Sequence, residues 1–161
     1  MPNKLEETVR DLFRTHDLHL AAAESCTGGL ISHRITDVPG SSEYFTGGIV
    51  AYSYEAKASL LNVSWDTLNT KGAVSKETVL EMARGVRHAL QSDIAVSVSG
   101  IAGPGGGTAE KPVGTTWIGL VTPEDEWTRH FIWAGDRAQN KQYSCDAALQ
   151  LILDYLEGKL K

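Results

Sequence analysis

The sequence has few cysteines and no excess of basic residues, and each shortage excludes a class of protein. Its 161 residues include two cysteines, Cys26 and Cys145, which are too far apart for a CxxC motif or a zinc-ligand spacing. Lys and Arg number 15 against 20 Asp and Glu, which gives a formal net charge of −5. Proteins that bind nucleic acid usually need a basic face, and no run of Lys or Arg occurs here. We therefore expect no disulfide framework, no metal or other cofactor and no nucleic-acid partner.

Long hydrophobic runs are also missing. A membrane-spanning helix needs about 20 apolar residues, and the longest apolar runs of this chain have the length of strands. Residues 1–14 mix charged and apolar side chains, which predicts an amphipathic helix and argues against a signal peptide. We therefore expect a cytoplasmic protein without a membrane partner. A chain of this length removes roughly 70% of its unfolded surface from water, so a single domain over residues 1–161 is expected.

What the sequence does contain is an order of patterns typical of α/β proteins. Strand patterns occur at residues 18–23, 48–53, 93–101, 115–122 and 127–134. Helical patterns occur at residues 1–14, 29–36, 55–61, 75–89 and 137–156. Helices and strands alternate early, and a hairpin comes late. This order predicts a three-layer α/β/α sandwich with a mixed, mainly parallel sheet and a C-terminal β-hairpin followed by a helix.

Glycine is abundant, with 16 residues, and a first group follows the first predicted strand. The segment 24–29 reads ESCTGG, so Ser25, Cys26 and Thr27 are three potential nucleophiles at the start of a helix. Free N–H groups there would stabilise a developing anion. A serine or threonine in this place is more often a helix cap, and the segment is not a GxSxG elbow because Ala23 replaces the first glycine.

A second polar segment, Tyr52 to Lys57, follows the second predicted strand. Carboxyl ends of parallel strands face one crevice in an open α/β sheet, so Ser25 and Tyr52 should lie near the same opening. A buried lysine with a lowered pKa serves as a base for a serine. Lys57 is therefore the candidate base and Tyr52 a proton relay, while a core aromatic and a solvated charge remain the alternative interpretation.

The third segment, 100–114, is a glycine-rich loop between two strands. It fails the P-loop pattern because Glu110 precedes Lys111 and Pro112 follows it. It also fails the dinucleotide pattern, since Thr108 stands at the place of the final glycine and a strand follows. The N–H groups of such a loop could form an anion nest, or the loop could be a flexible connector; we favour a phosphate or oxyanion cradle.

Other features carry less information. Five histidines are scattered without a metal spacing, and no Ser/His/Asp arrangement is visible. Asp136 could cap the last helix. Arg137 is either a solvated charge or a contact for a ligand anion.

Taken in order, the motifs AESCTGG (23–29), Tyr52-Ser53 with Lys57, and SGIAGP (99–104) through KPVGT (111–115) closely resemble the CinA C-terminal-domain family. The resemblance covers nearly the whole chain. Some relatives carry an extra N-terminal domain, and we expect this chain to be the stand-alone form. Characterised members are nicotinamide-nucleotide amidases, which hydrolyse nicotinamide mononucleotide (NMN) to nicotinate mononucleotide and ammonia in pyridine-nucleotide salvage. The resemblance thus implies an amidase of this kind that commonly forms homodimers.

For the site, the resemblance implies Ser25 as nucleophile, with Lys57 and Tyr52 as its basic and relay partners. Cys26 is the rival nucleophile. The substrate-binding residues that we expect around this centre are Cys26, Thr27, Gly28, Gly48, Ser99, Gly100, Gly103, Gly106, Thr108 and Arg137. Relatives often have asparagine where this chain has Tyr54. An alternative from another class is a non-catalytic regulatory module that binds a pyridine nucleotide through the same loop.

Overall fold

A computed structural model describes residues 4–161 of the chain, so the first three residues of the predicted helix 1–14 lie outside it. The strands are β1 Leu20–Glu24, β2 Phe45–Val50, β3 Ile94–Gly100, β4 Thr115–Val121 and β5 Glu126–Ile132. The helices are α1 Leu5–Phe13, α2 Leu30–Thr36, α3 Tyr54–Leu61, α4 Trp65–Lys71, α5 Lys76–Leu90 and α6 Arg137–Leu156, with a 3₁₀ turn at Ser41–Glu43.

The strands form one mixed sheet in the order β2-β1-β3-β4-β5. β1 pairs in parallel with β2 and β3, whereas β4 runs antiparallel to both β3 and β5. Glu24, the last residue of β1, pairs with Val50 on one side and with Val98 on the other. The carboxyl ends of three parallel strands therefore meet at one edge of the sheet.

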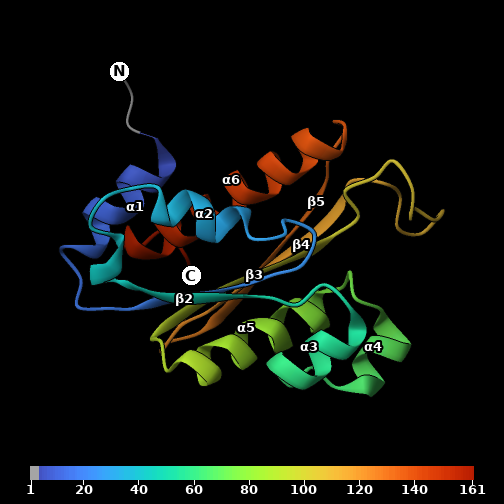
Figure 1. Cartoon of the computed structure of the whole chain (residues 1–161), viewed down its shortest axis with the longest axis horizontal. Helices are drawn as coiled ribbons and strands as arrows, with labels where there is room; N and C mark the ends of the chain where they lie inside the picture. Colours follow the sequence, from blue (N-terminus) through green and yellow to red (C-terminus); the bar gives the residue numbers. More distant parts are fainter. Residues whose placement is uncertain (1–3) are drawn as a thin grey trace.

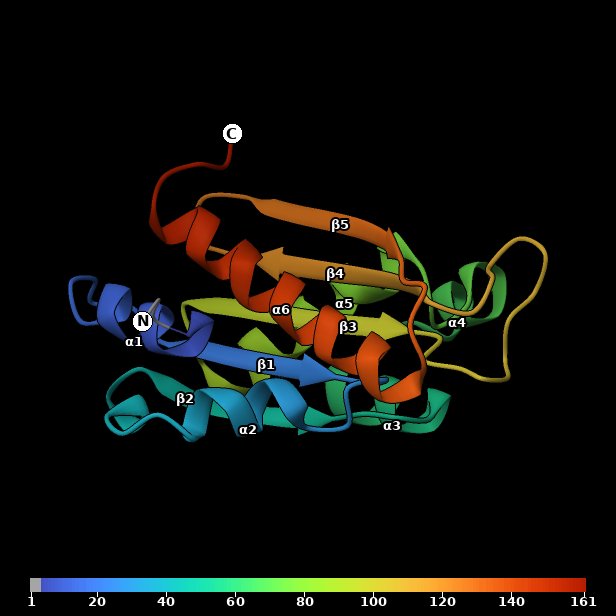
Figure 2. The ribbon, with the colours of Figure 1, turned by 90° about the horizontal axis from the view of Figure 1, so that it is seen from above.

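Helices cover both faces of the sheet, as Figures 1 and 2 show. α1, α2 and α6 lie on one face, and α3, α4 and α5 lie on the other (Figure 1). β1 is buried on both faces because Leu20 and Ala22 pack into the first core, while Ala21 and Ala23 pack into the second. The predicted three-layer α/β/α sandwich is confirmed.

The connections around β1 create a reversal point in the strand order, and we call the region beyond the carboxyl ends of β1, β2 and β3 the crevice. α2 links β1 to β2 across one face, and the chain returns from β2 to β3 through α3, α4 and α5 on the opposite face. β1 therefore lies between two neighbours, β2 and β3, whose connecting helices cover opposite faces of the sheet. In open α/β sheets, ligands bind outside the carboxyl ends of the strands at such a reversal point.

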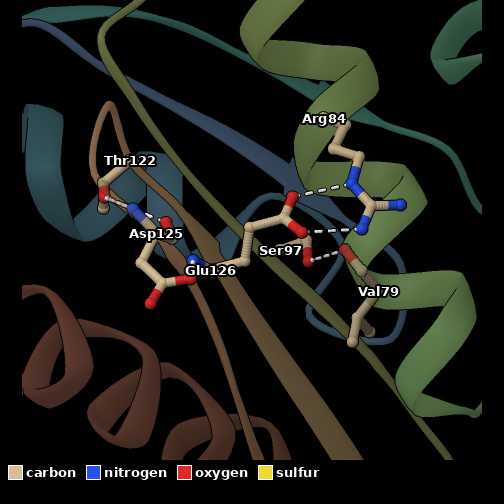
Figure 3. Close-up of polar contacts among 6 residues, drawn as sticks. All are labelled: Val79, Arg84, Ser97, Thr122, Asp125 and Glu126. Atoms are coloured by element: carbon tan, nitrogen blue, oxygen red, sulfur yellow. Dashed lines mark hydrogen bonds and ion pairs between the residues drawn. The ribbon is translucent and has the colours of Figure 1, made fainter. Parts of the chain in front are cut away.

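α5 packs unusually close to the sheet, and two polar contacts hold it there. The buried Ser97 hydroxyl of β3 donates to the carbonyl oxygen of Val79 at 2.5 Å, and Arg84 binds the Glu126 carboxylate with two bonds of 2.6 and 2.7 Å (Figure 3). Gly119 of β4 makes the approach possible, because a Cβ there would lie 2.9 Å from the Val79 oxygen.

Two elements differ from the sequence prediction. α4 was not predicted: its seven residues contain a single fully buried apolar side chain, Leu68, so no helical periodicity develops. Ser64 begins this helix, since its side chain accepts from the N–H groups of Asp66 and Thr67. β2 begins at Phe45 and ends at Val50, so Tyr52 follows the strand instead of lying within it.

Gly85 provides a test of the contact between α3 and α5. Helix propensity favours alanine over glycine by about 1 kcal/mol, yet a Cβ at Gly85 would lie 1.9 Å from the carbonyl oxygen of Leu61. We expect Gly85→Ala to lower the free energy of unfolding by about 1 to 3 kcal/mol, because the two helices must separate. Urea denaturation measures this change.

The matched control is Gly105→Ala, since a Cβ on Gly105 meets nothing within 4 Å. A Gly85→Ala variant as stable as the wild type would show that α3 moves away from α5 at no cost.

Candidate active site

Ser25 stands directly after β1, at the edge of the sheet where the parallel strands end. Its N–H donates to the Val98 carbonyl oxygen at 3.1 Å, which extends the β1 and β3 pairing by one residue. The turn then bends away, because Gly28 and Gly29 adopt φ angles of 61° and 105°, a region that favours glycine. The backbone of Ser25 is thus fixed by the sheet on one side and by the glycine turn on the other.

Lys57 reaches Ser25 from the other face of the sheet. It lies in the first turn of α3, which the Ser53 side chain caps by accepting from the Ala56 N–H. The Lys57 side chain is 1% exposed, and its Nζ lies 2.9 Å from Ser25 Oγ. Burial lowers the pKa of the Lys57 ammonium from 10.5 to about 8. A substantial neutral fraction therefore exists near neutral pH.

The other two partners of Lys57 decide where its lone pair points. Nζ also lies 3.0 Å from the carbonyl oxygen of Ala51 and 3.0 Å from that of Tyr52. Carbonyl oxygens only accept, so a neutral amine gives them its two N–H groups. The remaining tetrahedral position, which holds the lone pair, then faces the Ser25 hydroxyl. This arrangement suits a base that accepts the serine proton.

Cys26, the neighbouring thiol, has a different environment. It is 7% exposed, and burial raises the pKa of its thiol to about 11. Its Sγ lies 3.2 Å from the position that a Cβ on Gly100 would take, so the sulfur packs against the end of β3. A thiol that stays protonated is a weak nucleophile, which favours Ser25 over Cys26.

Glu24 is a residue of the site that the sequence analysis did not single out. Its carboxylate is fully buried, and Oε1 accepts from the Thr27 hydroxyl at 2.6 Å and from the Ile31 N–H at 2.9 Å. Oε2 accepts from the N–H and the hydroxyl of Ser32 at 2.9 and 2.7 Å. Glu24 therefore ties the serine turn to the start of α2. Its position at the end of a buried strand, beside a serine, was the available signal.

Among the described residues, three backbone N–H groups of the turn, those of Cys26, Thr27 and Gly29, have no protein acceptor, and the first two are nearest to Ser25 in the chain. The Gly28 N–H donates to the Ser25 carbonyl at 3.0 Å and is therefore occupied. The turn thus offers donors from Cys26 and Thr27 beside the Ser25 hydroxyl.

Tyr52 and Arg137 meet above the crevice. The Tyr52 side chain is 60% exposed, and its hydroxyl accepts from the Arg137 guanidinium at 3.1 Å. The same guanidinium donates to the Gly103 carbonyl oxygen at 2.8 Å. Arg137 therefore bridges segments that follow β2 and β3, on either side of β1. The contact that Tyr52 makes with Lys57 comes from its backbone carbonyl, which differs from the predicted relay through the phenol.

The glycine-rich loop projects past the carboxyl ends of β1 and β3 (Figure 2). Asn140, which the sequence analysis also missed, anchors its base, since its side chain donates to the Ala102 carbonyl oxygen at 3.0 Å. Packing explains several glycines: a Cβ at Gly103 or Gly107 would meet Val113 within 2.6 Å, and one at Gly114 would lie 2.0 Å from the Trp133 oxygen.

The remaining predicted substrate contacts lie in three places. Ser99 and Gly100 end β3 next to the serine turn. Gly106 and Thr108 lie at the exposed end of the loop, where the Thr108 hydroxyl oxygen accepts from the Lys111 N–H. Gly48 lies inside β2 under α2, where a Cβ would be 2.2 Å from the Ser32 Oγ. Close packing against α2 accounts for Gly48, and it is not brought to the crevice.

No group of His, Cys, Asp and Glu side chains within residues 4–161 has the arrangement of a metal site. In the same part of the chain, no helix is long and apolar enough to cross a membrane.

Comparison with known proteins identifies the family. The family model of the CinA C-terminal domain matches residues 2–156. The chain belongs to the CinA C-terminal domain family. A CinA-like protein of Chlorobium limicola is 51% identical over 158 residues, which are 95% of this chain and 37% of that protein. A putative competence-damage inducible protein of Halothermothrix orenii is 47% identical, over 98% of this chain and 38% of that protein.

The chain thus spans well under half the length of these curated relatives. Solved structures match nearly the whole of this chain and nearly the whole of their own chains. The competence/damage inducible protein CihA of Agrobacterium tumefaciens has a TM-score of 0.89 at 36% identity and is covered to 98%, as is this chain. A competence or damage-inducible protein of Enterobacter asburiae has a TM-score of 0.91 at 32% identity, over 96% of this chain and 99% of that one.

Glu24→Gln tests the role of the buried carboxylate in this CinA domain. An amide has one acceptor oxygen, and its NH₂ group would face donors, so some of the four bonds to Glu24 are lost. We expect the free energy of unfolding to fall by about 1.5 to 3 kcal/mol. Chemical denaturation measures the loss.

The control is Glu77→Gln, which changes an exposed carboxylate on α5. A Glu24→Gln variant within about 0.5 kcal/mol of the wild type, as for an ordinary surface change, would contradict the structural role of Glu24.

Proposed function

We propose that this CinA domain is a serine amidase that hydrolyses the carboxamide of NMN to the carboxylate of nicotinate mononucleotide, releasing ammonia. The observation that carries the proposal is the buried contact between Lys57 and Ser25. Acyl-transfer enzymes use a nucleophile, a base and donors for the oxyanion. Here the Lys57 lone pair faces the Ser25 hydroxyl, and backbone N–H groups without an acceptor lie beside it. The substrate class rests on the resemblance to nicotinamide-nucleotide amidases.

In the first half of the reaction, neutral Lys57 accepts the Ser25 proton while Oγ bonds to the carboxamide carbon. The carbonyl π electrons move to oxygen, and the N–H groups of Cys26 and Thr27 hold that oxyanion. When the oxygen re-forms its double bond, the carbon–nitrogen bond breaks. The Lys57 ammonium gives its proton to the departing nitrogen, so ammonia leaves and an ester to Ser25 remains.

Water completes the cycle through the same groups. Lys57 accepts one proton of the water as its oxygen attacks the ester carbon. Collapse of the second oxyanion breaks the bond to Ser25 Oγ, which regains the proton from Lys57. The products are a carboxylic acid and the original enzyme, and the acid loses its proton to the solvent or to the released ammonia to become a carboxylate. The carbonyl oxygens of Ala51 and Tyr52 keep Nζ in place throughout, since each accepts an N–H in both protonation states.

Ser25→Ala is the first test. It removes the attacking atom, and loss of a nucleophile that acts with its base lowers kcat by about 10⁴-fold or more. Ammonia release from NMN should therefore fall to background, as measured by a coupled ammonia assay. Ser42→Ala, at an exposed serine, is the matched control and should keep wild-type turnover.

Two outcomes would contradict this assignment. Release of ammonia by Ser25→Ala at the wild-type rate would exclude Ser25 as nucleophile, and loss of turnover in Cys26→Ala alone would move that role to the thiol. Stabilisation of the wild-type protein by NMN without ammonia release would support a non-catalytic nucleotide-binding module instead.

The lowered pKa of Lys57, about 8, sets the pH dependence of the reaction. The neutral amine is the active form, so activity is lost as the pH falls. We expect kcat/KM to rise about tenfold per pH unit below pH 8 and to level off above it. Initial rates between pH 6.5 and 9.5 measure the profile.

Lys57→Arg should be inactive across this range, because a guanidinium does not deprotonate in proteins. A flat profile, or full activity of the arginine variant, would rule out Lys57 as the base.

A further inference from the structure

A cavity of about 360 Å³ opens between the start of α2 and the first turns of α6, and it has no assigned role. Its lining consists of Leu30, Arg137, Ala138, Lys141 and Gln142. Two of these side chains are cationic, and none is a carboxylate, in a chain whose net charge is −5. Figure 2 shows the start of α6 at the same edge of the sheet as the carboxyl end of β1.

Lys141 places its charge next to the serine turn. Its Nζ lies 3.8 Å from the position that a Cβ on Gly28 would take. Gly28 is itself bonded to the Ser25 carbonyl through its N–H. Within residues 4–161, Lys141 forms no ion pair. Its ammonium is therefore available to a ligand that also reaches Ser25.

Arg137 precedes Lys141 by four residues, so the two side chains lie on the same side of α6. The guanidinium gives one N–H to Gly103 and one to Tyr52, and three of its five donors remain. At the start of the helix the Asp136 carboxylate accepts from the Gln139 N–H. The full positive charges in this cavity belong to the Arg137 and Lys141 side chains, so these side chains are the groups that would attract an anion.

The glycine-rich loop offers less charge to an anion. Its only lysine, Lys111, donates to the Lys71 carbonyl oxygen at 2.6 Å and points to the end of α4. Several of its glycines are explained by contacts with Val113 and Trp133. The loop therefore offers an anion only backbone groups, whereas the cavity offers the charged side chains of Arg137 and Lys141.

We propose that Lys141, together with Arg137, binds the phosphate monoester of the substrate in the cavity between α2 and α6. This inference rests on the proposed function, because it places the phosphate of NMN so that the ring carboxamide lies over Ser25. Leu30 supplies an apolar wall for the part of the nucleotide between the two groups. Lys141 then selects nucleotides over nucleosides.

The test compares Lys141→Gln with the wild type on NMN and on nicotinamide riboside, which lacks the phosphate. We expect KM for NMN to rise about 10- to 100-fold, the factor that a charge-assisted hydrogen bond contributes, with kcat little changed. Kinetics on the riboside should not change. Lys76→Gln, at an exposed lysine on the opposite face of the sheet, is the control. An unchanged KM for NMN, or an equal loss on both substrates, would overturn the proposal.

A binding measurement separates this inference from the amidase assignment. Inorganic phosphate, titrated against chloride at constant ionic strength, should raise the melting temperature of the wild type and of Lys76→Gln but not of Lys141→Gln. If that pattern appears while no ammonia is released, the anion site stands and the amidase function fails. If ammonia is released and phosphate acts equally on all three proteins, the amidase stands and the anion site is refuted.

Discussion

The candidate site depends on one buried amine. Lys57 is removed from water, and its three neighbours are two carbonyl oxygens and one hydroxyl. Desolvation disfavours the ammonium and lowers its pKa to about 8. The two carbonyl oxygens accept N–H groups of the amine and so orient its lone pair. A solvated lysine at the same place in the sequence would stay charged and would have no fixed direction. Burial therefore lowers the pKa of the Lys57 ammonium, and the packing of α3 places its Nζ against the Ser25 hydroxyl.

The end of β1 is buried because strands flank it on both sides and helices cover both faces of the sheet. The small residues of β1, Ala21, Ala22 and Ala23, allow helices to approach from both faces, so the end of the strand is covered on all sides but one. Glu24 then holds the turn against α2, and Gly48 allows α2 to come down onto β2. Arg137 bridges the crevice between the segments after β2 and β3. The N–H groups of Cys26 and Thr27 lie at this end of β1 and have no acceptor among the described residues.

Much of this arrangement could be predicted from the sequence. Strand and helix patterns gave the three layers, and the last helix was placed at its observed bounds, because long periodic segments carry a strong signal. The seven-residue α4 was missed because one buried leucine makes no period. Ser25 and Lys57 were expected to meet because each follows a parallel strand, and the structure brings them to 2.9 Å. The association of two copies stays a prediction.

The sequence by itself determined the order of the strands and of the longer helices, the family and the residue types at the carboxyl ends of the strands, since these follow from local patterns and from motifs. Only the tertiary structure decided that the Tyr52 hydroxyl lies against Arg137, that Gly48 serves packing, that Glu24 binds the start of α2, and that Lys141 lies beside the serine turn. These contacts join residues from different elements, and their directions depend on how closely helices pack on the sheet. The spacing of residues along the chain does not encode how closely the helices pack on the sheet.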